Sequence, residues 1–460
     1  MSRILSVAKF TILSILRFRL GIVMLVVLAA GVGGLPFIIK HNGTAEAFVQ
    51  VYLTYTVGFV TLLLGLTTLW LGCSLLSRDI EESQLQLVTT KPVARWEIWA
   101  GKWLGLMGFN CALMGLSAAA IYGLLHYQAG QLTDQEKSVL HETVLVARNG
   151  ITEPPQDRSL EIETIFKERM KMEDVAKMGE EMVKQKVTED VLMMDQVVTP
   201  NHMRFWNMDL PTWRQEKLAG EKTHIRFKFH AAEFQRGAVY DLSWVVATRD
   251  GAKQWETNVK LTAERIHEIA IPAGAIPERK PFRIECRNYS DLTLIFPSDT
   301  PLELLYKDGN FATNYMRAIL IIICGLGLMG ALGLFASSFL SFPVATFMTL
   351  SMILLFSSGN LMQEVLVENT LGNTEQEGGP STAIRTLDKI MIPVFRFFSS
   401  TLKNFSPGSP IESLTDGRSI PTGLVVATFF KQIVIAGGFL ALLGMFVLSR
   451  RELATAHSKS

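Results

Sequence analysis

The chain has 460 residues, of which 48% are hydrophobic and 19% are charged, and its formal net charge is +1. Soluble chains carry roughly 25% charged residues, and the shortage here is uneven. Positions 131–310 hold 55 of the 87 Asp, Glu, Lys and Arg residues, which leaves 32 for the other 280 positions. This division excludes a single soluble enzyme domain, a disordered chain and a disulfide scaffold. It also gives no sign of nucleic-acid binding, because such proteins normally show a basic domain or face.

Six stretches in the apolar ends have the length, about 20 residues, that a helix needs to cross the hydrocarbon core. Ala318–Gln363 contains no Asp, Glu, Lys or Arg and is too long for one span, so we expect it to turn at 337–343, with Pro343 opening the second helix. The predicted spans are 20–39, 47–77, 103–133 (its helix ending near Tyr127), the two halves of 318–363, and 424–448.

The orientation of these spans follows from the Lys and Arg residues in the short loops. Residues 1–19 carry four basic residues and no acidic one, and 78–102 also carries four basic residues. On the opposite side, 40–50 has one basic residue, and the longer 364–423 loop has five against seven acidic ones. We therefore expect both termini in the cytoplasm and the charged section outside.

The charged section is expected to be an extracytoplasmic α+β domain inserted between two membrane halves. The stretch from Leu160 to Met194 has the pattern of solvated amphipathic helices. Segments such as Ile225-Arg-Phe-Lys-Phe-His then alternate apolar and polar residues between turn signals, which is typical of an antiparallel β-sandwich. The predicted division is 1–127 and 313–460 for the membrane halves and 128–312 for the outer domain, helical over 131–210 and a β-sandwich over 222–308.

Two residue types in the outer domain could carry chemistry. Cys286 has no other cysteine in this domain to pair with, and its place in an alternating segment predicts a buried thiol. Eight of the 19 methionines fall within 170–208, near His202. Clustered thioethers could hold Cu(I), but their irregular spacing favours the packing of apolar helix faces.

The rest of the sequence shows no enzyme motif. It contains no Gly-x-x-x-x-Gly-Lys-Ser/Thr, His-Glu-x-x-His, Cys-x-x-Cys or Gly-x-Ser-x-Gly pattern. We therefore expect no catalytic residue, no cofactor and no metal site. The first four spans also lack charged residues, which disfavours proton- or sodium-coupled transport. Asn110, in the third span, is the candidate intramembrane polar residue, and it would either line a pathway or bond to a neighbouring helix.

Glycines recur within the predicted spans. Small residues allow helix backbones to approach closely, so their abundance favours a packed bundle or a dimer over lipid-facing flexibility. These residues are Gly101, Gly105, Gly325, Gly327, Gly330, Gly333, Gly437, Gly438 and Gly444.

The most informative segment, 77–105, joins the second and third spans. Its sequence predicts a short helix over 81–89, a break at Lys91-Pro92, and a second helix start with Arg95, Trp96 and Trp99 where an interfacial belt is expected. An ordinary amphipathic loop on the membrane surface would have the same composition.

The residue order of this segment resembles the corresponding loop of ABC-2 type transporter permeases, especially the multicopper-enzyme-maturation branch. The shared features are an acidic stretch, a Lys/Arg-Pro-Val/Ile-x-Arg turn and a Gly-Lys-x-x-Gly opening of the third span. The resemblance continues in 331–345, in Asp416-Gly-Arg-Ser-Ile-Pro and in Ser449-Arg-Arg-Glu-Leu, and covers roughly 1–127 and 312–455. In the loop, the matching residues are Asp79, Glu81 and Glu82; Lys91, Pro92, Val93 and Arg95; and Gly101, Lys102 and Gly105.

The resemblance implies a six-helix permease subunit in the bacterial inner membrane, paired with itself or with a second permease. A separate cytoplasmic ABC ATPase would drive it, docking on the loop as on a coupling helix. The stretch before the first span would lie along the membrane lipid, and 385–405 would form an outer amphipathic helix. The coupling residues so implied are Asp79, Glu81, Glu82, Lys91, Pro92, Arg95, Trp96 and Glu97.

The outer domain departs from the minimal loop of this family. Its size suggests an extracytoplasmic protein, polysaccharide or lipid partner rather than plain lipid or drug export. The alternative is a non-transporting membrane-anchored protein whose outer domain binds or senses an extracytoplasmic partner.

Overall fold

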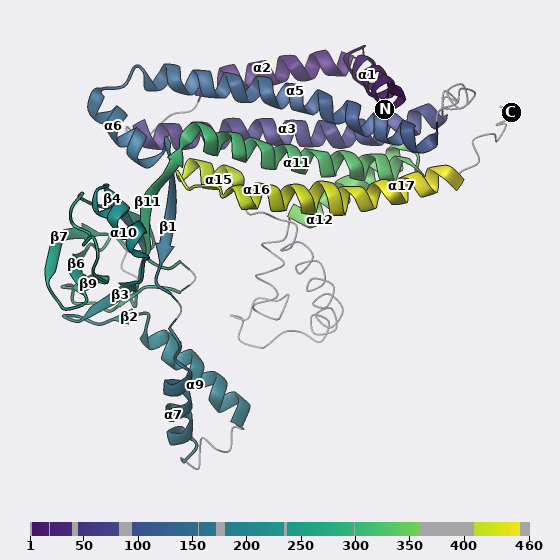
Figure 1. Cartoon of the computed structure of the whole chain (residues 1–460). Coiled ribbons are helices and arrows are strands. Elements are labelled where there is room, and N and C mark those ends of the chain that lie inside the picture. The colour runs from purple at the N-terminus through teal and green to yellow at the C-terminus, as the bar shows by residue number, and fades with distance from the viewer. Residues whose placement is uncertain are drawn as a thin grey trace. The chain divides into compact units, whose positions relative to one another are not determined.

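The computed structural model of the chain divides into two compact units (Figure 1). The helical unit comprises Met1–Ala147 and Gly309–Ser460, and the β unit comprises Arg148–Asp308. The structure describes residues 2–17, 19–38, 45–81, 94–154, 156–171, 180–233, 237–298, 300–357 and 409–450.

The helical unit contains four helices that are long and apolar enough to cross a membrane, counted over the described residues. They are α3, α5, α11 and the continuous helix made by α16, η1 and α17; the bent pair of α1 and α2 would add a fifth if it crosses as one span. The unit therefore has the character of a membrane protein, while six spans stay a prediction. Its helices are α1 (Ser2–Arg17), α2 (Arg19–Ile38), α3 (Ala45–Glu81), α5 (Arg95–Ala129), α6 (Asp134–Thr143), α11 (Phe311–Ser337), α12 (Phe342–Ser357), α15 (Pro410–Thr415), α16 (Thr422–Thr428), η1 (Phe429–Gly437) and α17 (Gly438–Arg450).

Close packing between helices uses the glycines that the sequence places in the spans. A Cβ atom on Gly333 of α11 would lie 3.0 Å from Gly72 Cα of α3, and one on Gly101 of α5 would lie 2.6 Å from Val7 Cβ of α1. Because side chains at these positions would collide with a neighbouring helix, the glycines set the distance between helices. The expected packed bundle is confirmed within one chain, and a dimer stays a prediction.

The β unit is built on antiparallel sheets, as the alternating segments predict. Its three sheets have the strand orders β1-β11-β4-β8, β2-β10-β5 and β3-β9-β6-β7. The strands are β1 (Val146–Thr152), β2 (Val197–Val198), β3 (Met203–Met208), β4 (Thr223–Lys228), β5 (His230–Ala231), β6 (Tyr240–Thr248), β7 (Lys253–Leu261), β8 (Ile266–Ile271), β9 (Phe282–Asn288), β10 (Leu294–Ile295) and β11 (Glu303–Asn310).

The section predicted to be helical, 131–210, is more mixed than expected. The structure places α7 (Ser159–Arg169) and α9 (Glu180–Met194) there, but also β1, β2 and β3. The strand residues of β3 have the period of two that marks a half-buried strand, with Trp206 and Met208 buried. The high charge of the neighbouring helices masked this short pattern. By its contacts, helix α6 belongs to the helical unit, and the β unit begins at Arg148. The start of the extracytoplasmic section near 128 stays a prediction.

An aromatic core holds the β unit together. Trp244 of β6 is fully buried, with its ring centroid 4.2 Å from that of Phe227 and 5.8 Å from that of Trp206. Cys286 of β9 is buried in the same core, as predicted, and burial raises the pKa of its thiol. Such a thiol is inert, because the reactive form is the thiolate.

The methionine-rich stretch contributes little to this core. Met208 is fully buried, whereas Met193 and Met194 at the end of α9 are more than half exposed. The packing of helix faces favoured by the sequence holds for Met170, which packs against the valines of α9. Met208 is buried on a strand, and Met193 and Met194 are not buried. Among the described residues, no group of three or more His, Cys, Asp or Glu side chains is placed to hold a metal ion.

Candidate functional site

A buried ion pair joins the two helices that flank the loop between α3 and α5. The Nζ atom of Lys102, on α5, lies 2.5 Å from Asp79 Oδ2 and donates a second bond to the Leu75 carbonyl oxygen at 2.5 Å, both on α3. The side chain of Lys102 is 8% exposed and that of Asp79 is 29% exposed. A charge removed from water needs such a partner, because an unpaired buried charge is costly. The pair therefore fixes the end of α3 against α5.

Glu81, the last residue of α3, meets the start of α12. Its Oε1 atom accepts a hydrogen bond from the Phe342 main-chain N–H at 3.4 Å, and the guanidinium of Arg78 lies 5.5 Å from the Phe342 ring centroid. Glu81 also brings a negative charge to the N-terminal end of α12, which suits the helix dipole. The segment between α11 and α12 is thereby tied to α3.

Arg95, the first residue of α5, binds the other end of the chain. Its Nη1 atom donates to the carbonyl oxygens of Leu448 and Ser449, each at 2.7 Å, at the end of α17. A cation is favourable there because the last carbonyls of a helix lack partners and carry partial negative charge. The prediction that Trp99 belongs to an interfacial belt is wrong within the chain, because the side chain is 2% exposed and packs against α17. A Cβ atom on Gly444 of α17 would lie 2.9 Å from its Nε1 atom.

Two further coupling residues lie at the start of α5. Glu97 accepts a hydrogen bond from the Ala94 N–H at 2.9 Å and so caps the helix, while the Trp96 side chain is 51% exposed. Trp96 therefore presents an aromatic surface beside the cap. Glu82, Lys91 and Pro92 lie outside the described residues, as does the helix predicted at 385–405.

These contacts bring separate parts of the sequence to one end of the helical bundle. We call Asp79, Glu81, Arg95, Trp99 and Lys102 the helix-end cluster. It links the ends of α3 and α17 with the starts of α5 and α12. Three of the four segments that carry the family resemblance, the loop, 331–345 and the chain end at Ser449, contribute to it.

The fourth of these segments lies at the start of α11. The side-chain amide of Asn314 donates to the Arg418 carbonyl oxygen and accepts from the Ile420 N–H, each at 2.7 Å. Gly417 takes a φ of +64°, which glycine adopts without strain, and a Cβ atom there would lie 2.3 Å from the Thr143 carbonyl oxygen. This segment therefore holds α15, α11 and the end of α6 together.

Asn110 is completely buried in α5, and neither polar atom of its amide has a hydrogen-bond partner among the described residues. A buried amide without partners is costly. Within one chain, Asn110 therefore does not make the predicted hydrogen bond to a neighbouring helix.

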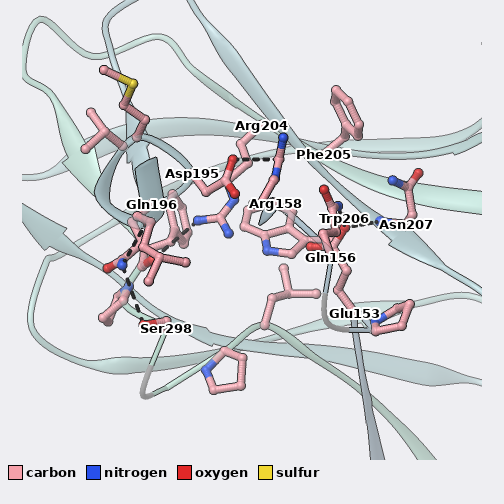
Figure 2. A pocket seen from close by; sticks show the side chains of 18 of the residues that line it. Glu153, Gln156, Arg158, Asp195, Gln196, Arg204, Phe205, Trp206, Asn207 and Ser298 are labelled. Atoms are coloured by element: carbon pink, nitrogen blue, oxygen red, sulfur yellow. Dashed lines mark hydrogen bonds and ion pairs between the residues drawn. The ribbon is translucent and has the colours of Figure 1, made fainter. Parts of the chain in front are cut away.

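The β unit contains a cavity of about 760 Å³ along β3. Figure 2 shows Arg158 and Arg204 at its centre, between Gln196 and Ser298 on one side and Glu153 and Asn207 on the other. Arg158 is paired with Asp195 at 2.8 Å and with Glu161 at 2.9 Å.

Arg204 is held differently. Its guanidinium carbon lies 4.7 Å from the Trp206 ring centroid, and Nη1 donates to the Phe296 carbonyl oxygen at 3.3 Å. Burial lowers its pKa below the ordinary arginine value, opposed by the carboxylates of Glu153 and Asp195. No carboxylate lies within ion-pair distance of it among the described residues.

The sequence did not single out several of these residues. Lys102 was part of a recognised motif, but its partner Asp79 could not be assigned without the fold, and nothing marked Gly444 or Leu75 as neighbours of the loop. Arg158 and Arg204 stand among many charged residues, so neither composition nor spacing distinguished them.

Comparisons with family models, with curated proteins and with solved structures found no match to this chain. Function is therefore inferred from its residues and their geometry.

Proposed function

We propose that the chain is the permease subunit of an ABC-2 type transporter, with ATP hydrolysis supplied by a separate cytoplasmic subunit. It would cross a bacterial inner membrane six times, with both termini inside and the β unit outside, and would pair with itself or with a second permease. No catalytic residue in this chain is needed for such a role.

The observation that carries the proposal is the helix-end cluster. A coupling site has to convert movement of a docked partner into movement of helices. Because Lys102 joins α3 to α5 and Arg95 joins α5 to α17, displacement at the loop between α3 and α5 would be passed to three apolar helices. A loop that merely lies on the membrane would not need buried ionic contacts to helix ends.

A partner surface is available beside this cluster. Trp96 exposes half of its side chain next to the cap made by Glu97. Aromatic side chains are enriched at protein interfaces, where they bury large areas at low cost in conformational entropy. The exposed ring next to buried connectors supports docking at the loop.

The alternative function is a membrane-anchored binding or sensory protein. The cavity beside Arg204 favours it, since a ligand bound in the β unit would be sensed without any ATPase. In that case, the helices would anchor the chain or transmit a signal, and the loop would have no nucleotide-hydrolysing partner.

The two functions are distinguished by purifying the full chain in detergent together with candidate P-loop ATPases. We expect one ATPase to co-purify and its hydrolysis rate to rise in the complex. Replacing both Glu81 and Glu82 with Lys should abolish this stimulation by reversing two charges at the docking loop. Asp134→Lys is the matched control, because this exposed acid is on α6, beyond the other end of α5.

Either of two results would refute the coupling assignment. One is the absence of any co-purifying ATPase. The other is full stimulation retained by the Glu81→Lys, Glu82→Lys variant, provided that its thermal unfolding matches that of Asp134→Lys.

A further inference from the structure

β3 forms one edge of the sheet β3-β9-β6-β7 and pairs only with β9 among the described residues. In an antiparallel sheet, the N–H and C=O groups of successive residues point to opposite sides of a strand. Just before β3, the His202 carbonyl oxygen accepts a hydrogen bond from the Asn288 N–H at 3.0 Å, so residue 202 faces β9. By this alternation, the main-chain N–H and C=O groups of Arg204, Trp206 and Met208 point toward β9. Those of Met203, Phe205 and Asn207 point away from it.

One side-chain contact independently supports this direction. The main-chain N–H of Asn207 donates to Glu153 Oε1 at 3.1 Å, which is possible only if it faces away from β9. Glu153 thus occupies the edge at one end of the strand. The outward main-chain groups of Met203 and Phe205 have no hydrogen-bond partner among the described residues.

The cavity runs along this edge. It is lined by five consecutive residues of β3, 203–207, although successive side chains of a strand point to opposite faces. A space that touches all five therefore follows the main chain rather than one face of the sheet. Residues 194–197 and 296–298 form the opposite wall. The volume of about 760 Å³ falls within the range of about 300–1,000 Å³ that is typical of ligand sites.

β7, at the opposite edge of the same sheet, carries charged side chains of a kind that protects an edge from pairing, and β3 carries fewer of them. Proteins block exposed edges with charged side chains, lysine above all, because open edges pair with other chains. β7 carries Lys253, Glu256 and Lys260 along its length. β3 instead exposes about half of the side chains of Met203 and Phe205. The edge of β7 is thus charged, whereas the edge of β3 presents two half-exposed apolar side chains. Arg283 and Arg287 of β9 flank these side chains, 5.1 Å from the Phe205 ring centroid and 3.9 Å from Met203 Sδ.

Charge indicates what the open edge accepts. Arg158 is neutralised by Asp195 and Glu161, and Glu153 already accepts two hydrogen bonds, from Asn207 and Gln156. Arg204 is the lining cation without a carboxylate within ion-pair distance among the described residues, although Glu153 and Asp195 act on its charge from further away. Its stacking on Trp206 holds the guanidinium in place. A guanidinium positioned in this way binds a carboxylate well, because its planar fork can donate two parallel hydrogen bonds.

We propose that the edge of β3 binds an extended segment of an extracytoplasmic polypeptide by strand addition, with a carboxylate of that segment on Arg204. Main-chain groups of Met203 and Phe205 would supply the affinity, and Arg204 with the exposed side chains of the edge would supply the specificity. The carboxylate comes either from an acidic side chain or from the end of the polypeptide. This inference concerns the β unit alone and holds whether or not the helical unit is a transporter subunit.

The test uses the full chain in detergent and four fluorescent nonapeptides of alternating Thr and Val. Two carry Asp and two carry Asn at the centre, and one of each pair has an amidated C-terminus. Fluorescence anisotropy should show binding of the peptide that has both carboxylates and about tenfold weaker binding of the peptide that has neither, as expected for a charged hydrogen bond. Loss on Asp-to-Asn exchange identifies a side-chain carboxylate, and loss on amidation identifies a chain terminus.

Phe205→Pro tests the edge itself. It removes one outward N–H but no bond to β9, and proline is tolerated on edge strands that face away from their neighbour. We expect about tenfold weaker peptide binding. Phe205→Val keeps the N–H and should bind within about threefold of the unmodified chain by the same reasoning. Asn258→Pro makes the matching change at the edge of β7 and should bind normally. Arg204→Gln should abolish the preference for a carboxylate.

Hydrogen exchange gives a second measurement that needs no variant. In the free chain, we expect fast exchange at Met203 and Phe205 and slow exchange at Arg204 and Trp206, since only the latter pair bonds to β9. A bound peptide should slow the first two amides. The proposal is overturned if none of the four peptides binds, if Phe205→Pro and Asn258→Pro bind equally, or if an uncharged oligosaccharide protects these amides and the peptides do not.

Discussion

The helical unit and the β unit treat charged side chains in opposite ways. In the helical unit, the long-range ionic contacts gather at helix ends, as Lys102 and Arg95 show. In the β unit, most ion pairs lie at the surface around an aromatic core, such as Arg279–Glu216 at 2.8 Å. Arg148–Glu268 at 2.7 Å is an exception, because the Arg148 side chain is buried. An apolar bundle tolerates a charge only where it is paired or functional, so a charge there is informative. In the β unit, a single charge says little until its partners are known.

This difference implies that the two units owe their stability to different features. The helical unit depends on close approach of backbones at glycines, and the β unit on burial of large rings. Changes aimed at one feature should therefore leave the other unit intact.

The largest effect is expected from Trp244→Ala. The ring is fully buried, and removing it should lower the free energy of unfolding of the β unit by about 3–5 kcal/mol. Hydrogen exchange measured separately over 180–298 and over the helices of the helical unit should show loss of protection in the first region only. Trp213→Ala, at a side chain that is 63% exposed, should change little. Loss of protection in both regions would show that the units do not unfold independently.

Gly333→Ala should destabilise the helical unit and leave the β unit unchanged. The new Cβ atom would lie 3.0 Å from main-chain atoms of α3, so α3 and α11 must separate, at a cost of about 1–3 kcal/mol. Thermal unfolding in detergent measures the loss. Gly58→Ala is the control, because nothing lies within 4 Å of a Cβ there and alanine favours helix. Equal stability of the two variants would contradict the packing role of the glycines.

The Asp79–Lys102 pair should show energetic coupling in a double-mutant cycle. Asp79→Asn and Lys102→Met each remove one charge, and the double variant should be less destabilised than the sum of the singles by about 1–3 kcal/mol. We expect a smaller coupling energy than for a fully buried ion pair, because the Asp79 side chain is 29% exposed. Additive effects would mean that the two charges do not stabilise each other.

Arg95→Gln should have a smaller and more local effect. Loss of the charged donor at the carbonyl oxygens of Leu448 and Ser449 should cost about 1 kcal/mol and fray the end of α17. Faster hydrogen exchange at 446–450, with unchanged exchange in α3, is the expected signature. Unchanged exchange at both places would remove Arg95 as a connector between α5 and α17.

The smallest effect is a pH dependence at α6. Hydrogen bonds from the Thr133 hydroxyl and main-chain N–H lower the pKa of Glu136 below its ordinary value of 4.5. A carboxyl with a lower pKa in the folded chain stabilises it above that ordinary value and loses this effect as the pH falls through the folded value. The protection of amides at the start of α6, relative to an unfolded chain at the same pH, should therefore fall below about pH 4.5. Glu136→Gln keeps a hydrogen-bond acceptor but does not titrate, so its protection at the start of α6 should not depend on pH in this range.

Much of the fold could be predicted from the sequence, because the length of the apolar runs indicates the long helices and the alternation of apolar and polar residues indicates the strands. The apolar runs at 47–77 and 424–448 fall within α3 and within the helix from α16 to α17, and the alternation from Ile225 falls on β4. β3 could not be recognised, since six residues between charged helices give too short a pattern. The fifth predicted span runs to residue 363, and its part beyond Ser357 lies outside the described residues.

The candidate sites could be predicted to different degrees, because a local motif is visible in the sequence and a tertiary contact is not. The loop motif indicated Arg95, Glu97 and Trp96, but the partners of Arg95 lie more than 350 residues further along the chain. Such pairings depend on tertiary contacts that leave no local pattern. The edge of β3 depends on strand order, and Arg204 stands out only because its neighbours are paired with other groups.

The central claim, that an ATPase docks beside the helix-end cluster, is tested most directly by photocrosslinking. A benzophenone amino acid is placed at Trp96, which is 51% exposed, or at Trp99, which is 2% exposed and one helical turn away. In native membranes, the first position should crosslink to a P-loop ATPase and the second to α17 of its own chain. Absence of an ATPase crosslink from position 96, or equal capture from both positions, would contradict the claim.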